Sequence, residues 1–113
     1  MVSDNDRILQ MEGDLLKVLA HPTRLRILGL LQEGEHCVCD ITADLELEQA
    51  NVSQHLTVLK RQDLVSSRKE GLKVMYRVNY PETYALLEAC RRLLRAQARA
   101  AAAVLDEEER QTE

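Results

Sequence analysis

The sequence lacks phenylalanine and tryptophan and has only three tyrosines. An aromatic core is therefore excluded, and the core must be built from Leu, Ile, Val and Ala. No apolar run approaches the roughly 20 residues that cross a bilayer, so no membrane-spanning helix is expected. The first residues, Met-Val-Ser-Asp-Asn-Asp, are polar and acidic and do not resemble a signal peptide. We therefore expect a cytoplasmic protein with no membrane partner.

Cysteine is also scarce, with three residues, two of which are separated by a single residue. An odd number of cysteines in this spacing argues against a disulfide framework and favours metal, redox or core roles. Glycine-rich phosphate loops and internal repeats are absent from the sequence. The cysteine spacing is not Cys-x-x-Cys, and no group of nucleophile, base and orienting residue is recognisable. We therefore do not expect an enzyme.

The 113 residues are 45% hydrophobic and 30% charged, which is typical of one small globular domain. A monomer of this size buries only about two-thirds of its unfolded surface, so subunit association is expected to add buried area. The net charge is −4, but residues 49–80 contain six basic and two acidic side chains. The basic charge is thus confined to the middle of the chain, where a polyanion such as DNA could bind.

The hydrophobic spacing predicts a series of helices. An amphipathic helix is expected over residues 4–20, with an Asp or Asn cap, and a second over 22–32, after which Gly34 ends the pattern. A short third helix from Cys39 to about Leu45 and a fourth over 49–62 are separated by the polar turn 46–48. Two short helices joined in this way predict a helix-turn-helix unit at about 39–62.

The alternation of side chains over residues 64–78, with Gly71 at the tip, predicts a β-hairpin wing. A long helix is expected over 81–106, followed by a frayed acidic tail at 107–113. The fold class is therefore mainly α, a winged helix-turn-helix of about five helices and two strands in a single domain, 1–106. The terminal helices, about 4–20 and 81–106, are expected to pair in a homodimer.

The fourth helix carries short polar side chains on the side opposite its aliphatic residues, a pattern that suits the major groove of DNA. A solvated surface is the alternative interpretation. His55 could equally brace the helix against the core or touch a phosphate. We expect base-reading by Gln49, Asn51, Ser53, Gln54 and His55, and phosphate contacts from Lys60, Arg61, Arg68, Lys69 and Lys73. No cofactor is needed for this binding.

Cys37 and Cys39 fall at the cap and the second position of the third helix, close to unpaired backbone N–H groups that favour the thiolate. In a regular helix, side chains two residues apart point about 200° away from each other. Binding of one centre by both sulfurs would then require the first turn to stay open or to unwind. Such a change would couple the cysteines to the helix-turn-helix unit.

Three segments together resemble the ArsR/SmtB family of bacterial repressors: residues 19–28 (Leu-Ala-His-Pro-Thr-Arg-Leu-Arg-Ile-Leu), 51–59 (Asn-Val-Ser-Gln-His-Leu-Thr-Val-Leu) and 71–78 (Gly-Leu-Lys-Val-Met-Tyr-Arg-Val). The resemblance covers about residues 8–100. It implies a dimeric repressor that binds double-stranded operator DNA. Glu48 stands where relatives often have a Ser cap, and its carboxylate would repel phosphate.

Residues 35–41, Glu-His-Cys-Val-Cys-Asp-Ile, resemble the Glu-Leu-Cys-Val-Cys-Asp-Leu motif of the arsenic- and cadmium/lead-responsive branches of that family. The resemblance implies that Cys37 and Cys39 bind the inducer. Thr42 stands where many arsenic sensors have a third cysteine, and no cysteine precedes Cys37. These departures favour As(III) or Sb(III) over Cd(II) or Pb(II). The resemblance implies release of DNA when the metalloid binds.

The third inducer ligand is left open among Cys90, His36 and solvent. Cys90 also suits an apolar helix surface. His21 is expected to lie in a turn before Pro22 instead of binding the inducer. The zinc site of the family is excluded, because no histidine follows His55. An alternative function is a redox-responsive winged-helix regulator, in which oxidation of the thiols shifts the third helix.

Overall fold

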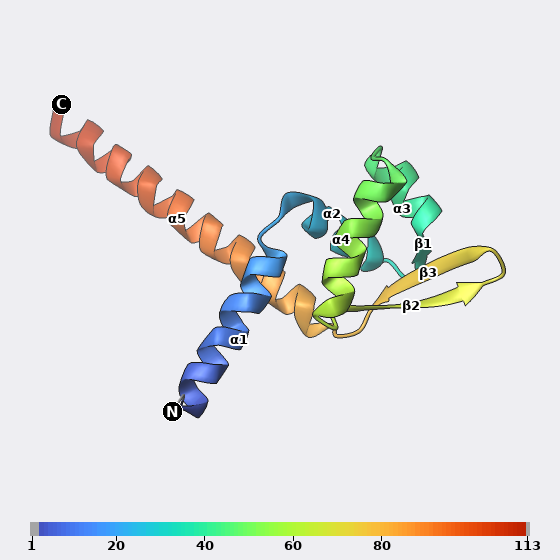
Figure 1. The fold of residues 1–113 in the computed structure, drawn as a ribbon. Coiled ribbons are helices and arrows are strands. Elements are labelled where there is room, and N and C mark those ends of the chain that lie inside the picture. Colours follow the sequence, from blue (N-terminus) through green and yellow to red (C-terminus); the bar gives the residue numbers. More distant parts are fainter. Residues whose placement is uncertain (1–2, 113) are drawn as a thin grey trace. The chain divides into compact units, whose positions relative to one another are not determined.

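The structure is a computed structural model that describes residues 3–112. Within that range it has five helices and three strands, and it divides into two compact units, one that ends at residue 80 and one that begins at residue 81. Their bounds are α1 Asp4–Leu19, α2 Pro22–Leu31, β1 His36–Cys37, α3 Val38–Leu45, α4 Gln49–Arg61, β2 Val65–Glu70, β3 Lys73–Val78 and α5 Glu82–Thr112 (Figure 1). The expected winged helix-turn-helix class is confirmed.

The first two helices begin and end at residues whose chemistry suits those positions. The cap of α1 is Ser3, whose hydroxyl accepts a hydrogen bond from the Asp6 amide at 3.1 Å, rather than the expected Asp or Asn. Pro22 opens α2, as its fixed φ favours. Gly34 follows α2 with a φ of 140°, a conformation that residues other than glycine rarely adopt.

The helix-turn-helix unit is formed by α3 and α4, which Figure 1 shows next to each other. The turn between them begins at Glu46, whose backbone is left-handed, with φ 55° and ψ 40°. Both helices turn aliphatic side chains into one core, which α2 and the start of β2 complete. Its largest fully buried members are Ile27, Leu28, Ile41, Val52, Leu56, Leu59 and Val65, together with Cys37.

The sheet has the strand order β1-β3-β2, and both pairings are antiparallel. The β2–β3 hairpin closes through two residues, of which Gly71 has a φ of 62°, as tight hairpin turns require. The sequence predicted this hairpin but not β1, whose two residues pair with Tyr76 and Met75 of β3. A strand of two residues has no periodicity that could reveal it.

A polar turn fastens the end of α4 to the end of β3. Asp63 adopts a φ of 60°, unusual for a residue other than glycine. The Asn79 side-chain amide donates to the Asp63 carbonyl oxygen at 2.9 Å, and the Tyr80 hydroxyl donates to the Asp63 carboxylate at 2.7 Å. The Leu64 amide donates to the Leu59 carbonyl oxygen, and the Asn79 amide to the Leu64 carbonyl oxygen. These bonds hold the left-handed turn in place.

The second unit consists of α5, which runs from Glu82 to Thr112. Residues 107–112, predicted to be a frayed tail, continue this helix; residue 113 lies outside the described part. The four alanines at 100–103 favour elongation, because Ala has the highest helix propensity and extension of a formed helix costs little. Several apolar side chains of α1 and α5 are exposed: Ile8, Leu9, Met11, Leu16, Leu93, Leu94, Val104 and Leu105. None of the described helices is both long and apolar enough to span a membrane.

Candidate functional site

The outer surface of α4 presents the polar side chains that the sequence assigned to DNA. The helix is anchored by Val52, Leu56 and Leu59, whose exposure is 0%. Periodicity then directs the intervening residues outward. Gln49, Asn51 and Gln54 are exposed, whereas Ser53 and His55 are partly buried. The three exposed side chains are free to reach a ligand, and the two partly buried ones are closer to the protein body.

Beside this surface lies an open groove of about 450 Å³, lined by α4 residues and by Arg24 of α2. Arg24 donates from Nε to Nδ1 of His55 at 3.2 Å and from Nη1 to the Val18 carbonyl oxygen at 3.0 Å. The His21 and His55 rings lie 4.5 Å apart, centroid to centroid. His21 is also the cap of α2, because its Nδ1 accepts from the Thr23 amide. His55 therefore braces α4 against α2 in this structure.

Burial lowers the pKa of His55 below its usual 6.5, and the neighbouring His21 and Arg24 lower it further. The neutral ring is thus the favoured form. With Nδ1 accepting from Arg24, the proton of the neutral ring lies on Nε2. The sequence alone did not reveal this cluster, because His55 lies on another helix, 34 positions after His21 and 31 after Arg24.

The expected phosphate-binding residues differ in exposure and in whether their side chains are already hydrogen-bonded within the protein. Lys60 donates to the Ser67 hydroxyl at 2.7 Å, which ties the end of α4 to β2. Arg61, Lys69 and Lys73 are exposed. Arg68 is instead held by carboxylates: its Nε lies 3.0 Å from Oε2 of Glu35, and its Nη2 lies 2.9 Å from Oε2 of Glu70. The sequence did not predict this pairing, because Glu35 lies 33 residues away.

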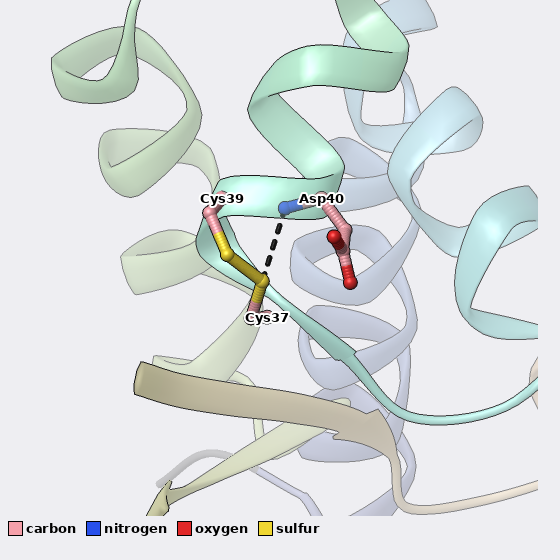
Figure 2. Close-up of side chains that lie close together, drawn as sticks. All are labelled: Cys37, Cys39 and Asp40. Atoms are coloured by element: carbon pink, nitrogen blue, oxygen red, sulfur yellow. Dashed lines mark hydrogen bonds between the residues drawn. A yellow bond between two sulfur atoms is a disulfide. The ribbon is translucent and has the colours of Figure 1, made fainter. Parts of the chain in front are cut away.

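The cysteine pair lies where β1 ends and α3 begins. Cys37 is the last residue of β1 and the N-cap of α3, and its Sγ accepts a hydrogen bond from the Asp40 amide at 3.1 Å. Cys39 is the second residue of α3, as expected. Figure 2 shows the two sulfurs joined in a disulfide beside the Asp40 side chain. Cys37 is buried, with an exposed fraction of 1%, whereas Cys39 is exposed.

Of the two expected routes, a first turn that stays open or one that unwinds, unwinding is not needed, because Cys37 lies outside the helix as an extended cap, with φ −76° and ψ 159°. That backbone turns its side chain back over the helix end, and the two sulfurs meet while α3 is intact. A change at the cysteines therefore acts on the junction between β1 and α3 without unwinding α3.

Three potential ligand groups gather here: the sulfurs of Cys37 and Cys39 and a carboxylate oxygen of Asp40, all within 4.8 Å of one another. Two soft thiolates suit As(III), Sb(III) or another thiophilic ion once the disulfide is reduced. Asp40 was missed as a neighbour, although its position directly after Cys39 was a usable signal. Of the proposed third ligands, His36 lies 2.8 Å from the Gly34 carbonyl oxygen through Nδ1, and Cys90 is exposed on α5.

Comparison with known proteins identifies relatives of this chain. The sequence pattern described as "Bacterial regulatory protein, arsR family" matches residues 21–67. An uncharacterized HTH-type transcriptional regulator of Mycobacterium tuberculosis, Rv0081, is 35% identical over 80% of this chain and 81% of its own length. The transcriptional activator HlyU of Vibrio cholerae is 42% identical over 70% of this chain and 73% of its own. The arsenical resistance operon repressor of Escherichia coli is 46% identical over 58% and 56%, respectively.

Solved structures agree with these relationships. The crystal structure of Rv0081 matches with a TM-score of 0.76 and 33% identity, over 84% of this chain and 96% of that one. A homodimeric winged helix-turn-helix DNA-binding domain from Mycobacterium bovis, solved by NMR, matches with a TM-score of 0.69 and 32% identity, over 85% and 89%. These likenesses extend over most of the chain, so they include the wing as well as the helix-turn-helix unit.

Proposed function

The chain belongs to the ArsR family of bacterial transcriptional regulators, a family of DNA-binding proteins rather than enzymes, and we propose that it is a cytoplasmic, homodimeric repressor controlled by Cys37 and Cys39. The exposed apolar side chains of α1 and α5 support the dimer, because an isolated chain leaves them in water. Dimerisation also gives two copies of α4, which suits an operator with two half-sites.

DNA binding would place the outer surface of α4 in the major groove. Gln49, Asn51 and Gln54 carry groups that match base edges, and Ser53 and His55 would complete the contact from its inner side. Lys60, Arg61, Arg68, Lys69 and Lys73 would position the protein on phosphates without reading sequence. In this role His55 would donate from Nε2, since Nδ1 accepts from Arg24.

One observation carries the proposed control: the two sulfurs meet at the start of α3, the helix that precedes α4 in the helix-turn-helix unit. In the reduced protein Cys37 and Cys39 would hold As(III) or Sb(III) as a dithiolate, which supplies strong, soft ligation. Cd(II) and Pb(II) suit the site less, because they usually take more ligands than two sulfurs supply. The arsenical repressor among the relatives supports this assignment.

A second candidate signal is thiol oxidation, and the disulfide in the structure favours it. Two thiols would give up two electrons and two protons to a peroxide, forming the Cys37–Cys39 bond and two molecules of water. The exposed Cys39 would react first, and the buried Cys37 would then displace water from the resulting sulfenic acid. Both signals would act at the same junction.

The test is fluorescence anisotropy of the reduced protein on labelled DNA from its own promoter region. Arsenite, Cd(II) and hydrogen peroxide are each titrated into a preformed complex. Cys37→Ser and Cys39→Ser should bind DNA like the wild type and lose the response, because either change removes one of the two sulfurs. Cys90→Ser should keep the response if the pair acts alone, and a lost response to arsenite would assign Cys90 as the third ligand.

Release by about one equivalent of arsenite per subunit would support metalloid control, and release by peroxide alone would support the redox signal. Tight binding that is indifferent to all three additives would refute control by the cysteines. Failure to bind DNA with a steep salt dependence would refute the repressor itself.

A further inference from the structure

The ion pair between Glu35 and Arg68 joins the cysteine segment to the wing. Arg68 lies on β2, and Glu35 lies two residues before Cys37, on the chain that leads into β1. The guanidinium meets both carboxylate oxygens of Glu35 through two nitrogens, with Nε at 3.0 Å from Oε2 and Nη2 at 2.5 Å from Oε1. A fork of this kind fixes the direction of the guanidinium as well as its distance.

The sheet register places Cys37 and Arg68 in one row. Cys37 of β1 pairs with Met75 of β3, and Met75 pairs with Arg68 of β2. Directly opposed residues point to the same side of a sheet, so Cys37 and Arg68 belong to one row across three strands. A shift of β1 at Cys37 would therefore move Glu35 relative to the wing.

Arg68 has the position and exposure of a DNA-binding side chain, but its guanidinium is already paired with carboxylates. Its side chain is 52% exposed, and that of Glu35 is 26% exposed. The Glu35 carboxylate offers the guanidinium the same two-oxygen geometry that a phosphate would offer.

We propose that Glu35 competes with DNA phosphate for Arg68 and links the Cys37–Cys39 pair to the wing. This inference rests on the proposed function. When the cysteines are joined or occupied, Glu35 holds Arg68 away from DNA; when they are reduced, β1 relaxes and Arg68 transfers to a phosphate. The structure contains both parts of the first state, the disulfide and the Glu35–Arg68 pair.

The first arm of the test compares DNA affinity of the peroxide-treated protein, in which Cys37 and Cys39 are joined, for wild type, Glu35→Gln and Glu33→Gln across a range of salt concentrations. Glu33→Gln is the matched control, because it removes the same charge two residues away, on an exposed side chain. Glu35→Gln should bind more tightly, and the slope of log K against log salt should steepen by about 1.8, because each of the two subunits gains one phosphate contact. The surface ion pair contributes little to folding, so circular dichroism should show each variant to be folded.

The second arm repeats these measurements in an Arg68→Gln background, where the advantage of Glu35→Gln should vanish. Persistence of the advantage there, or equal behaviour of Glu35→Gln and Glu33→Gln, would show general charge repulsion and overturn the proposal.

The third arm measures the ratio of DNA affinities before and after arsenite or peroxide. The ratio should be smaller in Glu35→Gln than in wild type, and an unchanged ratio would overturn the link to the cysteines. A wild-type protein that does not bind DNA would instead refute the proposed function. If wild type binds DNA but ignores both additives, the first two arms still decide the competition for Arg68.

Discussion

The two helices of the helix-turn-helix unit begin in different ways. At the start of α3, the Cys37 sulfur accepts the Asp40 amide, so a reactive side chain satisfies the helix end. At the start of α4, Glu48 occupies the cap position and makes no side-chain cap bond. Three fully buried aliphatic residues hold α4 instead. The comparison shows that α3 begins at a cysteine sulfur, whereas the start of α4 has no side-chain cap and this helix is held by packing alone.

The largest effect is expected from breaking the packing of α4. Leu56→Ala removes a side chain with 0% exposure, and it should lower the free energy of unfolding by about 2–5 kcal/mol, through lost burial and the cavity left behind. Urea unfolding of the reduced protein measures this. Leu72→Ala, at the exposed hairpin tip, is the matched control and should change stability by less than about 0.5 kcal/mol. Similar losses in both variants would mean that packing does not hold α4.

The next largest effect concerns the sulfur cap of α3. In reducing buffer, Cys37→Ala should be less stable to urea than Cys37→Ser by about 1–2 kcal/mol, because a hydroxyl can accept the Asp40 amide and a methyl group cannot. Both variants should lose the response of DNA binding to arsenite and peroxide. Equal stability of the two would show that the sulfur does not act as a cap, and a retained response in either would separate sensing from Cys37.

A smaller effect should follow from giving α4 the cap that it lacks. Glu48→Ser supplies a hydroxyl that can accept an amide of the first turn, and it should raise the free energy of unfolding by about 0.5–1 kcal/mol. Glu48→Ala removes the same charge without supplying a cap. Thermal or urea unfolding that ranks Ala at or above Ser would show that the carboxylate, rather than the missing cap bond, limits this helix end.

The smallest effect should come from the polar brace between α2 and α4. Because the pKa of His55 lies below 6.5 in the folded protein, the unfolded chain binds more protons as pH falls from 6.5 through the folded value. Acidification over this window should therefore lower Tm, and the loss should be smaller in His55→Gln. His36→Gln, whose ring lies outside the His21–His55 contact, is the control. If protonation of His55 does not weaken the contact between α2 and α4, wild type and His55→Gln would give parallel curves of Tm against pH.

Features written in local sequence were predictable. Pro22 opens α2, Gly71 closes the hairpin, and the spacing of Val52, Leu56 and Leu59 gives the buried side of α4, each from a few neighbouring residues. The placement of Cys37 at the cap of α3 was predictable for the same reason.

Features that depend on distant pairing were not predictable in this way. Arg68 was expected to be free for phosphate, but the sheet register brings it to Glu35. The His21–Arg24–His55 cluster requires the packing of α4 against α2. The meeting of the two sulfurs depended on the backbone angles of Cys37, which a helical pattern could not supply.

The turn at Asp63 has a consequence for hydrogen exchange. The Leu64 amide donates to the Leu59 carbonyl oxygen, and the Asn79 amide donates to the Leu64 carbonyl oxygen. The side chains of Asn79 and Tyr80 both donate to Asp63. Both bonds involve Leu64, so a movement of this residue would weaken both. The last turn of α4 and the exit of β3 are therefore expected to open together, with matching protection factors for the two amides. Local fluctuations at the root of the wing would at the same moment loosen the end of α4.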